Sequence, residues 1–258
     1  MDYPQQKQSK ILVIGETCID RYVEGSCDRI SPEAPVPILS KDNTFTRHGM
    51  ATNVATNINT LGQQTCLITN SSRIIKTRYI DKKTKQQILR VDENDKCQSI
   101  SDSDLLPLEN DSYEATVISD YNKGFLTNEQ LSELIEKLPK PIFVDTKKKD
   151  LSPFRGCIIK INESESKLVY NKPEDSELIV TLGSRGAKYR GEILPTLTCE
   201  VTDVCGAGDT FLASLAVHYC QYKNMRDAIK FANKCARIAV QRLGVYSVTL
   251  EDLNEIRN

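Results

Sequence analysis

The segment Asp203–Phe211, which reads Asp-Val-Cys-Gly-Ala-Gly-Asp-Thr-Phe, carries residue types suited to phosphoryl transfer. Small residues in a turn before a helix can direct their backbone N–H groups at one anion, and the positive end of the helix dipole favours that anion further. These residues are Gly206, Ala207 and Gly208. Asp209 lies beside this predicted anion hole, where it can take a proton from an attacking hydroxyl. An aspartate at a helix start is also a common cap, so the segment alone leaves both interpretations open.

The elements around this segment follow from apolar periodicity. The apolar-polar run Cys199–Val204 predicts a strand before it, and the periodic run after it predicts a helix. Further predicted strands are Ile11–Gly15, Cys66–Thr69, Ala115–Asp120, Pro141–Asp145, Cys157–Asn162 and Glu177–Gly183. Further predicted helices are Gly49–Gly62, Thr127–Leu138 and one that starts after Asn224 and Asp227 and runs to Leu243. This alternation predicts an α/β fold, with a mostly parallel sheet and helices on both of its faces.

Distinctive polar or turn residues stand at the ends of the predicted strands and at the start of the helix after the opening segment. They are Glu16, Asp20, Asp120, Asp145, Asn162, Gly183 and Asp209. Ligands of parallel α/β sheets bind at the carboxyl ends of the strands. We therefore expect these residues to share one active site.

A second, smaller sheet is predicted outside this pattern. Two short extended runs, Tyr22–Gly25 and Val36–Leu39, flank a proline-rich stretch, and proline belongs to edges and turns. The runs Ile74–Asp81 and Gln86–Asp92 predict a hairpin around a polar turn. We expect these pieces, about residues 21–45 and 73–92, to form a β lid on a single domain that spans residues 1–258.

Composition narrows the function classes. The chain has 258 residues and a formal net charge of -1, which gives no reason to expect a nucleic-acid partner. No apolar run approaches the length of a membrane span, and the polar first ten residues lack the apolar core of a signal peptide. The nine cysteines are odd in number and form no Cys-x-x-Cys, and there are two histidines. Free thiols in a reducing cytoplasm are therefore expected rather than disulfides or a zinc site.

Asp203–Phe211 resembles the D-T-x-G-A-G-D signature of the ribokinase/PfkB family of carbohydrate kinases. The resemblance covers nearly the whole chain, and within the family it is strongest to the kinase domain of bifunctional heptose 7-phosphate kinase/ADP-heptose synthases. The segments that carry it are Ile14–Tyr22, Arg29–Pro37, Ala51–Ile58, Leu61–Gly62 and Ser119–Gly124. It implies a ribokinase-like fold, a kinase that uses ATP and Mg²⁺, and a homodimer formed through the lid.

The resemblance also implies roles for individual residues. Asp209 becomes the catalytic base, with Gly206, Ala207 and Gly208 as the anion hole. Residues implied on the sugar side are Asp20, Gly49 and Asn53. Residues implied on the nucleotide side are Asn162 and Glu165 of the N-x-x-E motif, which organises Mg²⁺ and the phosphates, Thr181, Gly183 and Gly186 of a T-x-G-x-x-G turn, and Asn233 beside the adenine. Asp203 and Ser247 fall where a monovalent cation such as K⁺ would bind.

Cationic side chains give a further prediction about the acceptor. Lys76, Arg78 and Arg90 on the hairpin suit a substrate phosphate, although a solvated strand face explains them equally well. Lys123 follows a strand end, from which it can reach a phosphate.

The sequence departs from the family pattern at several points. The paired glycines of the sugar site appear as Gly49-Met50, so a bulky side chain is expected there, and Cys205 replaces the usual Thr or Ser. After Thr69 a unit of about 30 residues, the size of one strand-helix-strand crossover, is missing, and the stretch between Glu165 and Glu177 is short.

Three hypotheses follow. The favoured one is an ATP-dependent kinase of D-glycero-D-manno-heptose 7-phosphate that phosphorylates its 1-hydroxyl. The second is another PfkB kinase that acts on a hexose, a pentose or a nucleoside. The third is a degenerate kinase kept as a binding or regulatory protein, which the shortened chain and the altered glycines suggest.

Overall fold

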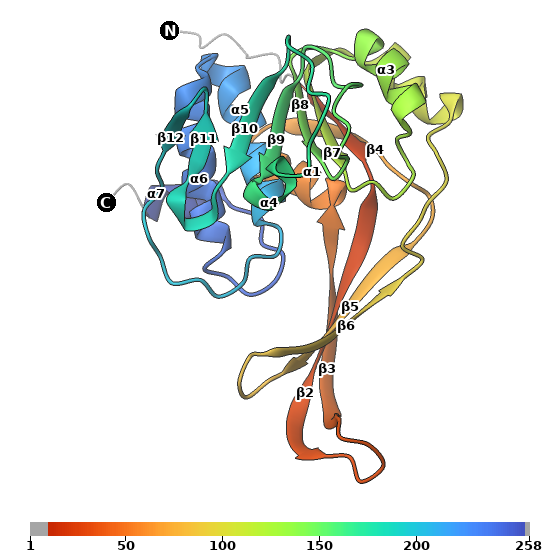
Figure 1. Ribbon diagram of the computed structural model, residues 1–258, viewed down its shortest axis with the longest axis vertical. Helices are drawn as coiled ribbons and strands as arrows, with labels where there is room; N and C mark the ends of the chain where they lie inside the picture. Colours follow the sequence, from red (N-terminus) through yellow and green to blue (C-terminus); the bar gives the residue numbers. More distant parts are fainter. Residues whose placement is uncertain (1–9, 256–258) are drawn as a thin grey trace, which may run out of the picture.

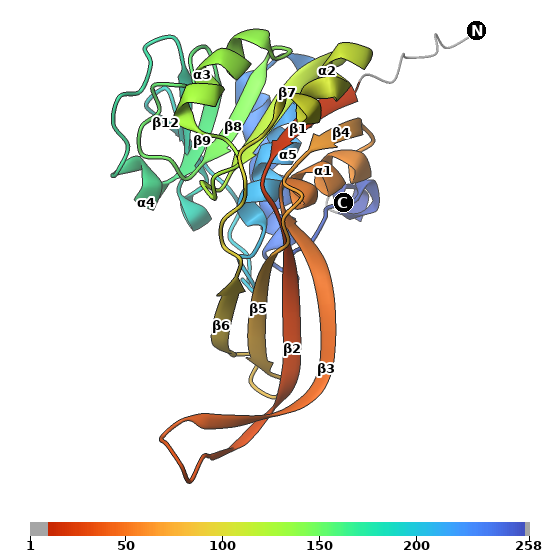
Figure 2. The same cartoon turned by 90° about the vertical axis from the view of Figure 1, so that its right-hand side faces the viewer.

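The structure is a computed structural model that describes residues 10–255. An eight-stranded sheet forms the body, and a four-stranded sheet projects from it (Figure 1). The turned view shows the strands of the smaller sheet extending away from the body side by side (Figure 2). The mixed α/β architecture that the sequence predicts is confirmed.

The body is a mostly parallel sheet in the order β12-β11-β10-β9-β8-β7-β1-β4. Its strands are β1 (Lys10–Gly15), β4 (Gln64–Ile68), β7 (Tyr113–Asp120), β8 (Ile142–Thr146), β9 (Ile158–Asn162), β10 (Glu177–Thr181), β11 (Ala187–Tyr189) and β12 (Glu192–Leu194). All neighbours from β4 to β10 pair in parallel, and β11 and β12 add an antiparallel edge. The carboxyl ends of six strands therefore lie along one edge of the sheet.

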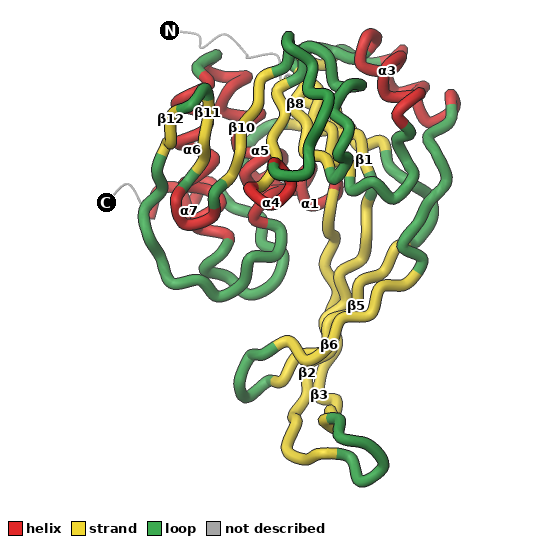
Figure 3. The backbone as a smooth tube through the Cα atoms, in the orientation of Figure 1, coloured by secondary structure: helices red, strands yellow, loops and turns green. Residues whose placement is uncertain are grey.

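Helices cover both faces of this sheet (Figure 3). Side chains alternate along β1, so Ile11 and Val13 pack in one apolar cluster and Leu12 and Ile14 in another. The first cluster holds α1 (Ala51–Thr60), α5 (Ala207–Tyr222), α6 (Met225–Ala239) and Leu253 of α7 (Leu250–Glu255). The second holds α3 (Asn128–Lys137), with Leu108 of α2 (Leu106–Asn110) packed against it. Burial on two faces explains why the strands read as unbroken apolar runs.

The projecting sheet has the order β3-β2-β5-β6. Its strands are β2 (Thr17–Ile30), β3 (Pro37–Met50), β5 (Ile74–Asp81) and β6 (Gln87–Glu93). Two side chains fasten it to the loop after α6: Arg47 donates to the carbonyl of Val245, and the hydroxyl of Tyr22 accepts the N–H of the same residue. Tyr22 also stacks on Phe45, with ring centroids 4.9 Å apart.

Three local predictions are wrong. Cys199–Val204 is a loop, because the N–H groups of Thr202 and Asp203 donate to the carbonyl of Val240 and not to a strand. That carbonyl is thereby occupied, and the N–H of Gly244, four residues on, donates instead to Asp203 Oδ2. Helix α6 ends at Ala239 and not at Leu243, because the N–H groups of Gln241 and Arg242 donate to carbonyls only three residues back. Asp20 stands inside strand β2 of the projecting sheet and not at a strand end of the body.

Connections on both sides of the body are short, as the sequence predicts. Residues 69–73 lead from edge strand β4 directly into β5, and the link from β9 to β10 contains only the four-residue α4 (Glu163–Ser166). The nine cysteines, which all lie within residues 10–255, are free thiols. Across that same part of the chain, no helix combines the length and the apolarity that a membrane span requires.

Candidate active site

Helix α5 begins at a turn whose two glycines leave little room for a side chain. Gly206 caps the helix with φ 76°, in the left-handed region that favours glycine, and a Cβ there would lie 2.8 Å from Nδ2 of Asn53. A Cβ on Gly208 would lie 2.9 Å from Nζ of Lys160. The N–H of Ala207 donates to the carbonyl of Val204 at 3.3 Å and is therefore not free for an anion. An anion hole with three N–H donors stays a prediction.

Asp209, in the first turn of α5, is buried with two hydrogen-bond partners. Oδ2 accepts from Nδ2 of Asn53 at 3.0 Å, and Oδ1 accepts from the hydroxyl of Tyr121 at 2.8 Å. Burial raises the pKa of Asp209 to about 6, against the two hydrogen bonds, which favour the charged form. A carboxylate with such a pKa is ionised at neutral pH and is still basic enough to accept a proton.

Tyr121, which the sequence analysis did not assign, stands between the two halves of the site. Its hydroxyl reaches Asp209, and its backbone N–H donates to the buried carboxylate of Glu16 at 2.8 Å. Its ring centroid lies 5.2 Å from Nζ of Lys76, on the side of the projecting sheet, and 5.4 Å from Nζ of Lys147, on the side of the body. Ammonium groups at these distances are attracted to the ring.

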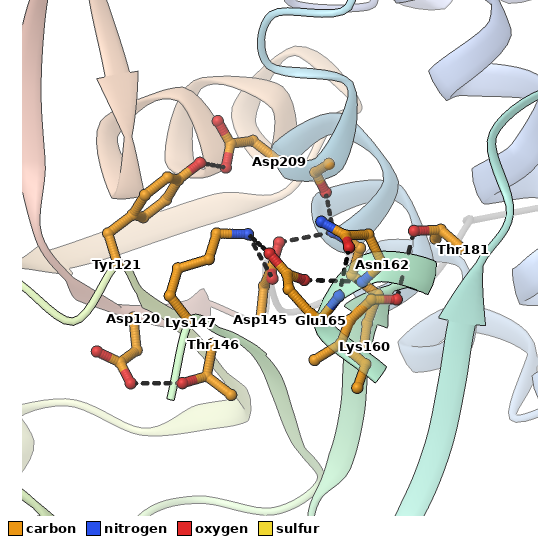
Figure 4. A network of polar contacts seen from close by, with 12 residues as sticks. Asp120, Tyr121, Asp145, Thr146, Lys147, Lys160, Asn162, Glu165, Thr181 and Asp209 are labelled. Atoms are coloured by element: carbon orange, nitrogen blue, oxygen red, sulfur yellow. Dashed lines mark hydrogen bonds and ion pairs between the residues drawn. The ribbon is translucent and has the colours of Figure 1, made fainter. Parts of the chain in front are cut away.

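A network of charges lies along the strand ends of the body (Figure 4). Nζ of Lys160 lies 2.6 Å from Oδ2 of Asp145, and both side chains are buried. Nζ of Lys147 lies 2.5 Å from Oε1 of Glu165 and 3.7 Å from Oδ1 of Asp145. That Oδ1 accepts no hydrogen bond from any residue in 10–255. It is therefore an anionic oxygen that a cation would satisfy.

The N-x-x-E motif forms a reciprocal cap. Oδ1 of Asn162 accepts the N–H of Glu165 at 2.8 Å, and Oε2 of Glu165 accepts the N–H of Asn162 at 2.8 Å. This arrangement is a capping box at the start of α4. It holds the Glu165 carboxylate next to Lys147 and Asp145.

A pocket of about 540 Å³ adjoins this network and contains most of the predicted nucleotide residues. One wall carries apolar side chains, namely Leu197, Val201, Val204, Phe211, Ala236 and Val240. The predicted residues that line it are Asn162, Thr181, Gly183, Gly186, Gly206, Ala207, Gly208 and Asn233. Asn233 donates to the carbonyl of Leu194 at 2.9 Å. Apolar walls beside a cationic end suit a molecule with a flat base and a charged tail.

The predicted sugar side is built around a buried ion pair between Asp20 and Arg78. A Cβ on Gly49 would lie 2.1 Å from Oδ2 of Asp20, so only glycine fits there. Met50 has φ 58°, a conformation that favours the glycine of the family pattern. Its side chain is buried against Cys18 and Ile74 and next to Tyr121.

The other predicted site residues, Arg90, Lys123 and Asp203, are engaged in contacts with neighbouring protein groups. Arg90 pairs with Asp92 on exposed strand β6, and Lys123 pairs with Asp95. The two carboxylate oxygens of Asp203 accept the N–H groups of Cys205 and Gly244. A cation site at Asp203 and Ser247 stays a prediction.

Comparison with known proteins supplies the family. The model of the pfkB family of carbohydrate kinases matches residues 115–252. The chain belongs to this family. It is 33% identical over 299 residues to the bifunctional protein HldE of a Nitratiruptor species, an alignment that covers 95% of the chain and 64% of that relative. It is also 33% identical over 307 residues to the bifunctional protein HldE of Helicobacter acinonychis. That alignment covers 96% of the chain and 66% of the relative.

The chain thus spans about 64% of the length of the first of these relatives. The alignment, at 299 residues, is longer than this chain of 258, so the relative contains segments that this pfkB-family chain lacks. Ribokinase from Thermotoga maritima has a TM-score of 0.70 at 18% identity, with 96% of this chain and 99% of that one covered. Phosphofructokinase-2 from Escherichia coli has a TM-score of 0.76 at 15% sequence identity, with 96% of this chain and 98% of that one covered. These likenesses establish a ribokinase-like fold.

Three polar residues of this pfkB-family site carried no assigned role in the sequence analysis. Tyr121 lies in the resembling segment Ser119–Gly124, which was the one available signal. Lys160 is the single charged residue in a buried strand, and Asn57 is a polar residue on a helix. Neither pattern indicated a functional role.

Proposed function

We propose that this pfkB-family protein transfers the γ-phosphoryl group of ATP to the 1-hydroxyl of D-glycero-D-manno-heptose 7-phosphate. The observation that carries the transfer is Asp209, a buried carboxylate whose pKa is raised to about 6, at the start of α5 and next to the pocket of about 540 Å³. Its Oδ1 and Oδ2 are held by Tyr121 and Asn53, which orients the carboxylate for one task.

The nucleotide half supports ATP as the donor. The phosphates would lie between the glycine turn of α5 and the ammonium groups of Lys147 and Lys160, with the adenine along the apolar wall. The buried Oδ1 of Asp145 accepts no hydrogen bond within residues 10–255, and with Glu165 nearby it fits Mg²⁺, which prefers oxygen ligands. Mg²⁺ held there would neutralise charge on the phosphates of ATP.

The transfer then needs one proton acceptor. Asp209 takes the proton of the acceptor hydroxyl while that oxygen forms a bond to the γ-phosphorus. The bond from this phosphorus to the β,γ-bridging oxygen breaks, and ADP leaves. Lys160 and Lys147 offset the negative charge that the phosphates bring.

Lys76 supports a phosphorylated sugar as the acceptor. Its side chain is 9% exposed, and within residues 10–255 it forms no hydrogen bond or ion pair. Arg78 beside it is already paired with Asp20. Asp92 lies opposite Lys76 across β5 and β6 and interacts with its charge, but it forms its ion pair with Arg90. A buried ammonium that no carboxylate contacts is costly, so an anionic group of the substrate would stabilise it.

The projecting sheet supports the predicted homodimer. Leu89 and Val91 of β6 are 54% and 39% exposed, on the face opposite Arg78 and Arg90. Ile30 and Val36 near the tip are 62% and 51% exposed. A second copy would cover these apolar side chains, and sedimentation of the wild type against Leu89→Lys tests this. The free cysteines fit a protein of the reducing cytoplasm.

The deciding experiment measures ADP release with ATP and Mg²⁺ against a panel of acceptors. The panel contains heptose 7-phosphate, the unphosphorylated heptose, fructose 6-phosphate, ribose and a nucleoside, and Asp209→Asn is the control. We expect release with heptose 7-phosphate and a new anomeric phosphate signal in ³¹P NMR. Faster release with an unphosphorylated sugar would favour another PfkB kinase, and ATP binding without any release would favour a regulatory protein.

A further inference from the structure

A line of buried amides joins Asp209 to the loop that follows α6. The backbone N–H of Val248 donates to Oδ1 of Asn57 at 3.1 Å. Nδ2 of Asn57 donates to Oδ1 of Asn53 at 3.0 Å and to the carbonyl of Asn53 at 2.9 Å. Nδ2 of Asn53 then donates to Oδ2 of Asp209 at 3.0 Å. All three side chains are less than 5% exposed.

The direction of these bonds follows from their first member. A backbone N–H only donates, so the amide oxygen of Asn57 must face Val248 and its NH₂ group must face Asn53. The oxygen of Asn53 is then occupied, and its NH₂ group points at Asp209. The two asparagines are four residues apart in α1, which puts them on one helix face. A reversed amide in this buried line would leave polar atoms unpaired, which is costly.

We propose that Asn57 is a positioning residue that fixes the amide of Asn53, so that Asn53 holds the carboxylate of Asp209 in place for proton transfer. This inference rests on the proposed function, in which Asp209 receives the proton. It gives Asn53 a task besides the sugar contact that the family resemblance implies.

Asp209 has other charged or titratable neighbours, and the test must separate them from the amide line. Asp145 raises its pKa, and Tyr121 and Lys160 lower it. Lys147 and the thiol of Cys18 also interact with its charge. None of these five groups belongs to α1 or to the loop that contains Val248. Substitution of Asn57 therefore leaves them all present.

The test compares Asn57→Leu with Thr60→Val. Thr60 lies on the same helix, and its Oγ1 donates to the carbonyl of Val248 at 2.7 Å, so Thr60→Val breaks a comparable bond without changing the amide order. We expect Asn57→Leu to lower kcat about 10-fold, the size of one lost hydrogen bond to a charged group, and to move the acid limb of kcat/KM to higher pH. Thr60→Val should do neither. If Asn57→Leu does not fold, Asn57→Ser is measured in its place.

Two further measurements make the proposal falsifiable. In an Asn53→Ala background, Asn57→Leu should cost nothing more in kcat, because Asn57 acts through Asn53. The pKa of Asp209 is also followed without substrate, by ¹³C NMR of the carboxyl carbon, with Asp209→Asn to assign the signal. A raised pKa in Asn57→Leu without turnover of any sugar would support the amide line and reject the proposed acceptor. An unchanged pKa, or additive losses in the double variant, would overturn the proposal.

Discussion

The two sides of the Tyr121 ring differ in how their charges are balanced. On the body side, Lys160 pairs with Asp145 and Lys147 pairs with Glu165. On the side of the projecting sheet, Arg78 pairs with Asp20, but Lys76 has no ionic partner within residues 10–255. The lysines of the body side thus have carboxylate partners before any substrate binds, and the other side retains an ammonium group that forms no ion pair within residues 10–255.

In the function we propose, this difference separates the phosphoryl transfer from the recognition of the acceptor. A nucleotide phosphate and a proton acceptor require fixed groups at the strand ends, and preformed ion pairs keep those groups in place. Recognition of one acceptor requires a buried polar or charged group that is unfavourable without a partner. Only the correct acceptor supplies that partner when it binds. In the function we propose, Lys76 is such a group, on β5 of the projecting sheet and opposite Asp20 of β2.

Loss of the proton acceptor should have the largest effect, because both sides depend on it. Asp209→Asn removes the base but retains the size of the side chain, so we expect kcat to fall about 10³- to 10⁴-fold. KM for both substrates should change little. Steady-state ADP release checks this, and turnover within 10-fold of the wild type would remove Asp209 from the mechanism.

The same variant carries a stability test. The folded-state pKa of Asp209 is raised to about 6 from 3.8, so its contribution to stability is present at low pH and is lost as the pH rises through 6. Asp209→Asn avoids this loss. Its Tm at pH 8 should therefore equal or exceed that of the wild type, measured by calorimetry. A lower Tm would indicate that the substitution damages the fold.

The glycine turn should come next, since it belongs to the preformed side. Gly206→Ala would put a Cβ 2.8 Å from Asn53, and we expect kcat to fall about 10²-fold, as when one transition-state donor is lost. Gly191→Ala is the matched control. Its φ is 83°, close to the 76° of Gly206, but nothing lies within 4 Å of its Cβ. Both variants should lose about 1 kcal/mol of stability and only the first should lose activity; equal kcat values would contradict this.

Local geometry could be predicted from the sequence, and contacts between distant residues could not, for a physical reason. The Gly206–Asp209 turn and the Asn162–Glu165 box are local, so their residue spacing already contains their geometry. The partners of Asp209 are distant in the chain: Tyr121 is 88 residues away and Asn53 is 156. The Cys199–Val204 strand was wrong because its periodicity could not reveal that Val240 would take its N–H groups.

A pair of lysine variants tests the comparison directly. Lys76→Met should raise KM for the sugar phosphate roughly 10- to 100-fold, the value of a hydrogen-bonded charge, and leave KM for ATP almost unchanged. Lys147→Met, on the other side of the Tyr121 ring, should do the reverse. Initial rates with each substrate varied in turn separate the two. If Lys76→Met raised KM for ATP instead, the two sides would not be divided in this way.

Tyr121→Phe should have the smallest effect, because it keeps the ring that both lysines face and removes only the hydroxyl. That hydroxyl donates to Oδ1 of Asp209 and so favours the charged carboxylate. Its loss raises the pKa of Asp209, and since the base works when ionised, the acid limb of kcat/KM should move from about pH 6 to a higher value by roughly 0.5 to 1 unit. Activity would fall several-fold at pH 6 and hardly at pH 8. If the acid limb of kcat/KM did not move, the Tyr121 hydroxyl would not tune the pKa of Asp209. Tyr121 would then only separate the two charged sides with its ring.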